Sequence, residues 1–365
     1  AYVTFTNDYI ESIWWLLKQM WEKDLLYQGH KVVPYSPSSG TALSSHEVSL
    51  GYKDITDPSV YVRFPLVDEP GTYLLAWTTT PWTLPSNVAL AVGADIDYVK
   101  VRGENRDGDT ETLILAEALV EKALKDAEGY EVVERVKGKQ LLDLAYNPLY
   151  TFFTVEDKRY AYVVEGDFVS TTDGTGIVHM APAYGEDDMR MGREYDLPVF
   201  VAVNEDGRFV DAATPFRGLN FKEADDQIVR DLKGRGLLYR KQNYKHSYPH
   251  DWRTGKPLMY FARPTWFIRT NDMKQQIVDR NQEVNWVPGH IKDGRFGNWL
   301  AELKDWALGR ERFWGTPLPI WIDEETGEQL CVGSVAELSE LTGEDQSELD
   351  LHRPYVDDIT FPNPN

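Results

Sequence analysis

The chain has 365 residues, which is long for a single hydrophobic core, so we expect two or more domains. Hydrophobic residues make up 42% and aromatic residues 13% of it, enough to build globular cores, which excludes a disordered chain. The formal net charge of −21 argues against a protein that coats nucleic acid without specificity.

Cysteine content and hydropathy narrow the class further. The single cysteine, Cys331, permits neither an internal disulfide nor a cysteine-rich zinc site. The sequence has no signal-type segment at its start and no uninterrupted run of about 18 apolar residues. We therefore expect a cytoplasmic protein with no membrane partner.

The first predicted element is an amphipathic helix that Asn7 can cap and Gly29 can end. Its apolar side chains recur at three- and four-residue spacing, at Ile10, Ile13, Trp14, Leu17, Met20, Trp21 and Leu25. Short strands are then expected at 31–35 and within 49–66.

Residues 73–240 mix strands with helices. The patterns predict strands at 73–79, 98–103, 130–136, 159–169 and 197–203. They predict helices at 114–129 and 221–236, both of which end at glycine. This mixture indicates an α+β fold with a β-barrel-like domain.

A local group of basic residues opposes the acidic total charge. Two interpretations stay open for it, a solvated face and a surface that docks RNA. Its members are Arg230, Lys233, Arg235, Arg240, Lys241, Lys245 and His246.

The segment WTTTPWTLPSN, residues 77–87, concentrates hydroxyl groups in one place. Threonine is common in strands, so packing alone could explain one or two of them. Pro81 should end the strand, which leaves Thr80 at the strand end, best placed to face a substrate. No adjacent base or free amino terminus would activate a threonine nucleophile, so hydrogen bonding to a substrate or a water is the more economical role.

The segment DGTGIVHMAPAYGEDDM, residues 173–189, places acidic residues at a predicted helix start. Glu186, Asp187 and Asp188 could be there simply because the helix dipole favours negative charge. A carboxylate stabilised in this way would also receive a cation. An isolated histidine such as His179 is more often structural than catalytic.

Together, WTTTPWTLPSN and the later GTGIVHMAPA resemble the editing domain of the isoleucyl-tRNA synthetases, an insertion in the catalytic fold of these class I enzymes. Flanking stretches such as YVTFTNDYIESIWWLLKQMWEK and DWALGRERFWGTPLPIW agree, so the resemblance covers essentially the whole chain. It implies hydrolysis of the ester that joins valine by mistake to the 3′ end of tRNA(Ile), and hydrolysis of valyl-adenylate. These are the expected partners, and we expect a monomer.

The resemblance also implies roles for particular residues. The expected catalytic positions are Asp188, which would hold the α-ammonium group, and Thr80 and Asn87, which would lie at the ribose and ester end. His179 would narrow the site against isoleucine, with Tyr184 beside it. No residue is an obvious general base, so we expect attack by a positioned water, which the terminal ribose hydroxyl could help. The other expected substrate-binding residues are Thr78, Thr79, Trp82 and Thr83.

By the same resemblance the chain divides into four segments. Residues 1–45 would form a connecting helix with a knuckle, and residues 46–240 the editing domain with its surrounding helices. Residues 241–322 would return towards the catalytic fold, and residues 323–365 would form a second connective segment. The flanking segments would be small α/β pieces.

The sequence departs from the family at two kinds of position. At the knuckle positions named at the end of this paragraph, hydroxyl and carboxylate side chains stand where several relatives have cysteine pairs. Hydroxyl and single carboxylate ligands make a poor tetrahedral zinc site, so we expect no metal and no cofactor in this chain. The HIGH-type and KMSKS-type signatures are absent, so ATP and magnesium would serve only a parent enzyme. The knuckle positions at which several relatives carry cysteine pairs are Ser36 and Ser39, Asp251 and Thr254, and Asp323 and Thr326.

Two functions of different class remain after these observations. The first is a hydrolase that edits Val-tRNA(Ile). The second is a noncatalytic insert, which docks tRNA or has a structural role and is inactive without the parent enzyme. A serine hydrolase is a distant third, because no G-x-S-x-G elbow occurs.

Overall fold

The computed structural model describes residues 3–105, 107–124, 129–301, 303, 305–309 and 315–364. The chain separates into two compact units, one of Lys31–Arg263 and one of Ala1–His30 with Pro264–Asn365. The four-segment division stays a prediction. No helix in the described ranges is both long and apolar enough to cross a membrane.

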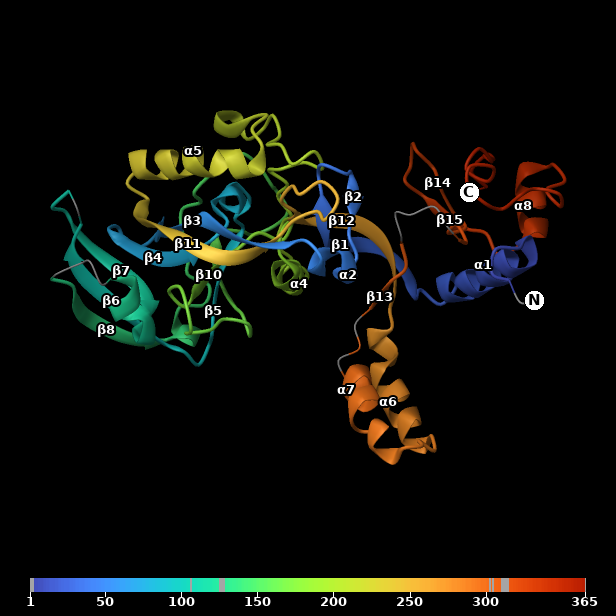
Figure 1. The fold of residues 1–365 in the computed structure, drawn as a ribbon, viewed down its shortest axis with the longest axis horizontal. Coiled ribbons are helices and arrows are strands. Elements are labelled where there is room, and N and C mark those ends of the chain that lie inside the picture. The colour runs from blue at the N-terminus through green and yellow to red at the C-terminus, as the bar shows by residue number, and fades with distance from the viewer. Residues whose placement is uncertain are drawn as a thin grey trace. The chain divides into compact units, whose positions relative to one another are not determined.

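The larger unit is built on a six-stranded sheet (Figure 1). Its neighbouring strands are antiparallel except for one parallel pair, β4 with β7. In spatial order the strands are β11 (Leu238–Pro249), β3 (Tyr52–Pro65), β4 (Thr72–Thr78), β7 (Thr110–Ala116), β6 (Asp97–Glu104) and β8 (Glu131–Lys137).

A second sheet of three strands packs beside β4. Strand β5 (Ala89–Val92) is central, with β10 (Ile177–Met180) antiparallel and β9 (Tyr162–Glu165) parallel to it. In the described part of the chain no sheet joins its first strand to its last, so the barrel-like closure is not confirmed. The architecture is mixed α and β with several open sheets.

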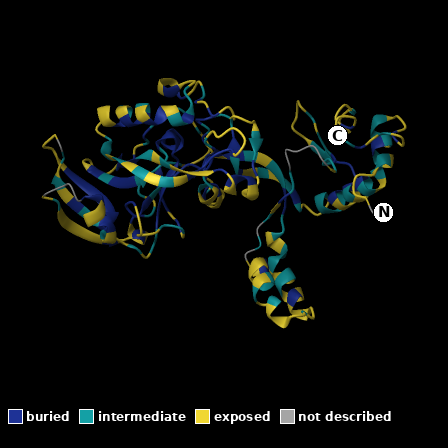
Figure 2. Ribbon diagram, viewed as in Figure 1, coloured by how far each residue is buried: buried dark blue, intermediate teal, exposed yellow. Residues whose placement is uncertain are grey.

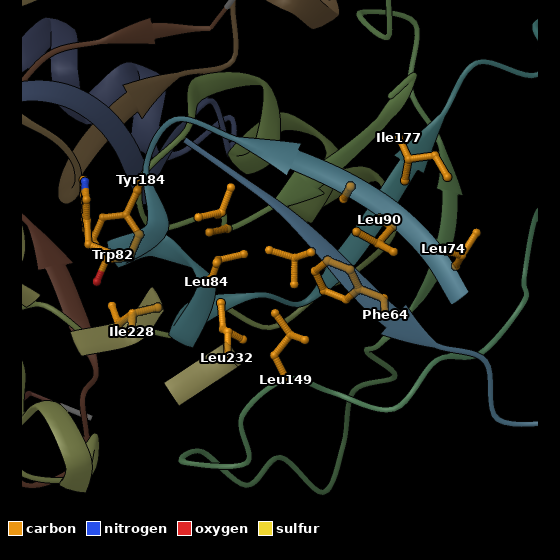
Figure 3. Packing of buried hydrophobic residues seen from close by; sticks show 14 of the residues in the cluster. Phe64, Leu74, Trp82, Leu84, Leu90, Leu149, Ile177, Tyr184, Ile228 and Leu232 are labelled. Carbon is orange, nitrogen blue, oxygen red and sulfur yellow. The ribbon is translucent and has the colours of Figure 1, made fainter. Parts of the chain in front are cut away.

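Helix α5 (Phe221–Gly234) covers one face of the large sheet. Asn220 caps it by accepting a hydrogen bond from the Lys222 amide, and its apolar side turns Ile228 and Leu232 into the core. Figure 2 shows the buried residues gathered where the strands and this helix meet, and Figure 3 shows their packing.

Short helices connect these strands. The α-helices of the larger unit besides α5 are α2 (Ser45–Ser49), α3 (Val120–Ala123) and α4 (Glu186–Glu194). The 3-10 helices are η1 (Pro81–Ser86), η2 (Glu117–Leu119), η3 (Gly138–Gln140) and η4 (Thr214–Phe216).

The smaller unit has its own core. Trp14 of α1 (Asn7–Trp21) is fully buried with Val332 and Leu338, and its indole donates to the Pro317 carbonyl at 3.0 Å. Its other helices are α6 (Lys274–Glu283), α7 (Arg295–Ala301) and α8 (Val335–Thr342), with 3-10 turns at Asn271–Met273 and Gly289–Ile291. Strands β14 (Ile320–Ile322) and β15 (Gln329–Cys331) pair. A further sheet is not confined to this unit, because two of its strands cross the boundaries at residues 30–31 and 263–264. Its order is β13 (Trp306–Ala307), β12 (Met259–Ile268), β1 (Leu26–Ser36), β2 (Thr41–Ala42).

One predicted boundary and two predicted elements are wrong. The first helix ends at Trp21, and Gly29 lies in β1, where a Cβ would come within 3.2 Å of the Phe267 ring. The helix predicted at 114–129 begins as the end of β7, because the apolar run fits a fully buried strand as well as a helix. Residues 125–128 lie outside the described ranges, as do 310–314 of DWALGRERFWGTPLPIW.

The third error is the strand at 197–203. This apolar run is largely buried but makes only one isolated bridge, from Val203 to Phe209. An apolar run can be buried without forming a strand, because strand pairing needs a neighbouring strand, which the sequence pattern does not reveal. The strand predicted at 159–169 is shorter in the structure, at Tyr162–Glu165.

Candidate functional site

The three threonines lie where β4 gives way to η1. Strand β4 ends at Thr78, and Pro81 begins the 3-10 helix, as expected from its missing amide hydrogen. The hydroxyls of Thr78 and Thr80 are 3.1 Å apart, and those of Thr80 and Thr83 are 3.3 Å apart. Thr78, Thr79 and Thr80 are half-buried, so their side chains remain accessible to a ligand.

A hydrogen-bonded chain leads from these hydroxyls into the protein. Thr83 Oγ1 is 3.0 Å from Nε2 of His179, the third residue of β10. Nδ1 of His179 is 2.8 Å from the amide nitrogen of Asn87, at the end of η1. Burial lowers the pKa of His179 to about 3, so the ring is neutral at physiological pH.

Asp188 is joined to the same strand from its other end. It lies in the first turn of α4, and its carboxylate accepts a hydrogen bond of 2.8 Å from the amide of Ala181, directly after β10. A Cβ at Gly185 would lie 2.6 Å from Asp188 Cγ, so a glycine is needed for this close approach. Burial raises the pKa of Asp188 to about 6, partly offset by the Ala181 hydrogen bond.

Two of the predicted substrate-binding residues are core residues. Trp82 meets the rings of Tyr184 and Phe221 edge-on, both at a centroid distance of 4.9 Å. Figure 3 shows Trp82 and Tyr184 side by side. The Tyr184 hydroxyl accepts from the Val203 amide at 2.7 Å, and both aromatic residues are buried. Trp82 and Tyr184 therefore pack in the core beside the threonine turn. That either residue contacts the substrate stays a prediction.

The structure thus brings together Thr78, Thr80, Thr83, His179 and Asn87 in one network. Asp188 is linked to this network indirectly: it accepts a hydrogen bond from the amide of Ala181, and Ala181 follows His179 by two residues in the chain. A carboxylate that can bind a cation and a row of hydroxyls that can hold a polar group are thus connected, each through hydrogen bonds, to β10 and the residue shortly after it. Such an arrangement can bind and orient a positively charged, polar ester.

Comparison with known proteins identifies the family. A family model described as tRNA synthetases class I (I, L, M and V) matches residues 1–364. The chain belongs to this family. It is 50% identical over 364 residues to the isoleucine--tRNA ligase of Clostridium acetobutylicum, covering 100% of this chain and 34% of that protein. It is 50% identical over 366 residues to that of Thermus thermophilus, covering 98% and 34%. The chain therefore spans about a third of the curated relatives it matches.

Similar solved structures are more distant. The editing domain of the P. knowlesi cytosolic leucyl-tRNA synthetase aligns with 54% of this chain and 99% of its own, at 12% identity and a TM-score of 0.40. The structure titled GlLeuRS-CP1 aligns with 50% and 99%, at 13% identity and the same TM-score of 0.40. This degree of similarity is too low to assign residue roles in the synthetase chain.

Sequence reasoning missed two residues that touch the network. The hydroxyl of Tyr146 donates to Asn87 Oδ1 at 2.6 Å, and Asp225 accepts from the Trp82 amide at 2.9 Å. Their partners are 59 and 143 residues away in the sequence, and neither residue stands in a recognisable motif. Only the folded chain could identify them.

The basic group is largely paired with acids. Arg235 contacts Asp231 at 2.6 Å, and Lys241 contacts Asp226 at 2.9 Å. Arg240 lies over the Tyr61 ring at 4.3 Å. These contacts favour the solvated-face interpretation over an RNA-docking surface.

The knuckle positions form hydrogen bonds. Asp251 is fully buried, and its carboxylate accepts from the hydroxyls of Ser36 and Ser39 and from the amides of Arg253 and Thr254. Asp323 accepts from two amides of its own turn. In the described ranges no group of three or more His, Cys, Asp or Glu side chains is arranged to hold a metal ion.

Proposed function

We propose that this chain is the editing region of an isoleucyl-tRNA synthetase, which hydrolyses the ester joining valine to tRNA(Ile), and also valyl-adenylate. The family and the identity to isoleucine--tRNA ligases support the context. The observation that carries the chemistry is the half-buried Asp188 carboxylate, held by the Ala181 amide at the end of the strand that presents His179.

Asp188 binds the α-ammonium group of the misplaced amino acid. Its charge is poorly solvated, as the raised pKa reports, so an arriving ammonium ion relieves an existing electrostatic cost. The Ala181 amide occupies one carboxylate oxygen and fixes the direction of the other. The side chain therefore anchors the substrate by the positive charge of its amino group.

The threonine hydroxyls hold the ester and the attacking water. Water oxygen bonds to the ester carbon, the bond from that carbon to the ribose oxygen breaks, and the water proton ends on the ribose oxygen. His179 takes no part as a base, because its pKa, lowered to about 3, makes the ring a very weak base and both nitrogens already have hydrogen-bond partners. Rate acceleration then comes from positioning and from hydrogen bonds to the developing oxyanion.

The need for this reaction follows from the size of the substrates. Isoleucine and valine differ by one methylene, and binding discriminates such a pair by only about 1–3 kcal/mol, a magnitude already known for this discrimination. His179 would exclude the larger isoleucine side chain from the hydrolytic site. A second selection by size then supplies the missing fidelity.

The remaining functions belong to the whole parent enzyme. That protein would ligate isoleucine to tRNA(Ile) with ATP and magnesium, in a part that lies outside this chain. We propose that the chain itself is a cytoplasmic monomer that uses no cofactor and no zinc. A chelator should then leave its thermal unfolding unchanged.

The decisive experiment is deacylation of Val-tRNA(Ile) by the purified chain and by Asp188→Asn. The variant keeps the shape of the side chain but leaves the substrate ammonium without its counter-ion, so we expect kcat/KM to fall about 100-fold or more. Asp187→Asn is the matched control, because Asp187 is exposed and precedes Asp188 in the same helix. It should stay within twofold.

Equal rates for the wild type and Asp188→Asn would reject the site. Tight tRNA binding with no hydrolysis at saturating protein would favour the alternative, a noncatalytic insert that docks tRNA.

A further inference from the structure

The amide of Asn87 has one possible orientation. The Ala89 carbonyl can only accept, so the group 2.9 Å from it must be the Asn87 nitrogen. The amide oxygen then faces Tyr146, whose hydroxyl donates to it at 2.6 Å. The second hydrogen on the nitrogen points to Nδ1 of His179 at 2.8 Å.

This orientation determines the tautomer of His179. Because Asn87 donates to Nδ1, that nitrogen must carry a lone pair, and the ring proton is on Nε2. Nε2 then donates to Thr83 Oγ1 at 3.0 Å. The hydrogen of Thr83 is directed to the Thr80 carbonyl at 2.9 Å, at the turn that carries the threonines.

Tyr146 is built to act as a permanent donor. Its side chain is almost completely buried, its ring meets Phe64 edge-on at 5.3 Å, and its backbone amide donates to Ala161. Burial raises the pKa of its hydroxyl well above the ordinary value, so the proton stays in place. Within the described residues, the Tyr146 hydroxyl is connected to the threonines only through Asn87.

We propose that Tyr146 and Asn87 are positioning residues, which hold His179 in its neutral Nε2–H form so that the ring supplies a fixed hydrogen bond to Thr83 and takes no proton in the reaction. The tautomer is a property of the folded chain alone. Its effect on the reaction rests on the proposed function. Asn87 thereby changes from an expected substrate contact to a support, because both of its N–H donors and one lone pair of its oxygen are already used within the protein.

The tautomer can be tested without substrate by ¹⁵N NMR of histidine-labelled protein, with His179→Gln assigning the resonances. We expect a protonated-type signal for Nε2 and an unprotonated-type signal for Nδ1, unchanged from pH 8 to pH 5. Asn87→Asp replaces the donor by an acceptor and should move the proton to Nδ1. A wild-type Nδ1–H signal, or a ring that protonates near its ordinary pKa, would overturn the proposal.

The effect on the reaction is tested with Tyr146→Phe, which removes one hydroxyl and keeps the ring packing. The buried Asn87 oxygen loses its donor, so we expect kcat for Val-tRNA(Ile) to fall roughly five- to tenfold with KM within twofold. Tyr248→Phe is the matched control, since it removes a buried hydroxyl that donates to the Leu258 carbonyl, outside the network. It should change neither parameter.

The results separate the two proposals. A wild-type chain without deacylation would reject the proposed function, whereas the NMR result would still decide the tautomer. A normal kcat in Tyr146→Phe, beside an active wild type, would show that the positioning is not used in hydrolysis.

Discussion

Asp188 is a single side chain whose environment suits its task. Its carboxylate is poorly solvated, and one hydrogen bond from Ala181 offsets only part of the resulting cost. An ammonium ion is therefore bound more strongly here than by an exposed carboxylate, such as that of Asp187. The same desolvation makes the site sensitive to acid.

We expect the deacylation rate to fall at low pH. The pKa of Asp188 is raised to about 6, so below that pH the carboxyl group is protonated and cannot pair with the ammonium group. The substrate amino group stays protonated and charged below pH 6, so the fall in rate at low pH must come from a group of the protein. Values of kcat/KM measured from pH 5 to pH 8 should drop about tenfold per unit below about pH 6. A profile that stays level down to pH 5 would contradict this assignment.

At the scale of elements, the start of η1 is capped by a residue from another helix. Thr80 occupies the N-cap position but makes no side-chain cap bond, and Pro81 has no amide hydrogen. The first free amide, that of Trp82, donates instead to Asp225 of α5, which is nearly fully buried. The Thr80 hydroxyl is thereby left to face Thr78 and Thr83.

Removing this cap should loosen the turn. Asp225→Ala leaves the Trp82 amide without an acceptor, at a cost of about 1–2 kcal/mol, so we expect the amides of residues 78–87 to exchange hydrogen about tenfold faster. Asp225→Asn keeps an acceptor oxygen and should restore slow exchange. Asp226→Ala, on the exposed side of α5, is the control and should leave this segment unchanged. Equal exchange in Asp225→Ala and the wild type would show that the cap does not hold the turn.

At the scale of the molecule, Asp251 ties together segments that are far apart in the sequence. Its carboxylate joins Ser36 and Ser39 to the turn at Arg253, across more than 200 residues. Burial raises its pKa, but hydrogen bonds from Ser39, Ser36 and the turn amides outweigh this and hold the pKa at about 2. One carboxylate at the centre of several donors thus links these segments.

We expect Asp251→Ala to lower the free energy of unfolding by about 2–4 kcal/mol, because several buried donors lose their charged acceptor. In the wild type this contribution is fully present above the unfolded-state pKa of about 3.9, and it is lost as the pH falls towards 2. Urea unfolding between pH 3 and pH 7 measures both effects. Asp323→Ala, which removes a solvent-exposed acceptor from two amides of its own turn and from the Asn363 side chain, should cost clearly less than Asp251→Ala. Equal losses in the two variants would contradict the linking role.

The amino-acid sequence alone determined the local features and the family. The strand before Pro81, the helix beginning at Glu186 and the helix beginning at Phe221 depend on side chains a few residues apart, so pattern and capping rules predicted them. The long motifs around Thr80 and His179 were sufficient to indicate the synthetase family.

Only the tertiary structure decided which side chains meet. It buried Trp82 and Tyr184, joined Tyr146 to Asn87 and Asp225 to the turn, and made the segment at 114–116 a strand. Each result depends on contacts between residues far apart in the sequence. Such contacts arise from the path of the chain through both sheets, and no local preference of the residues involved encodes that path.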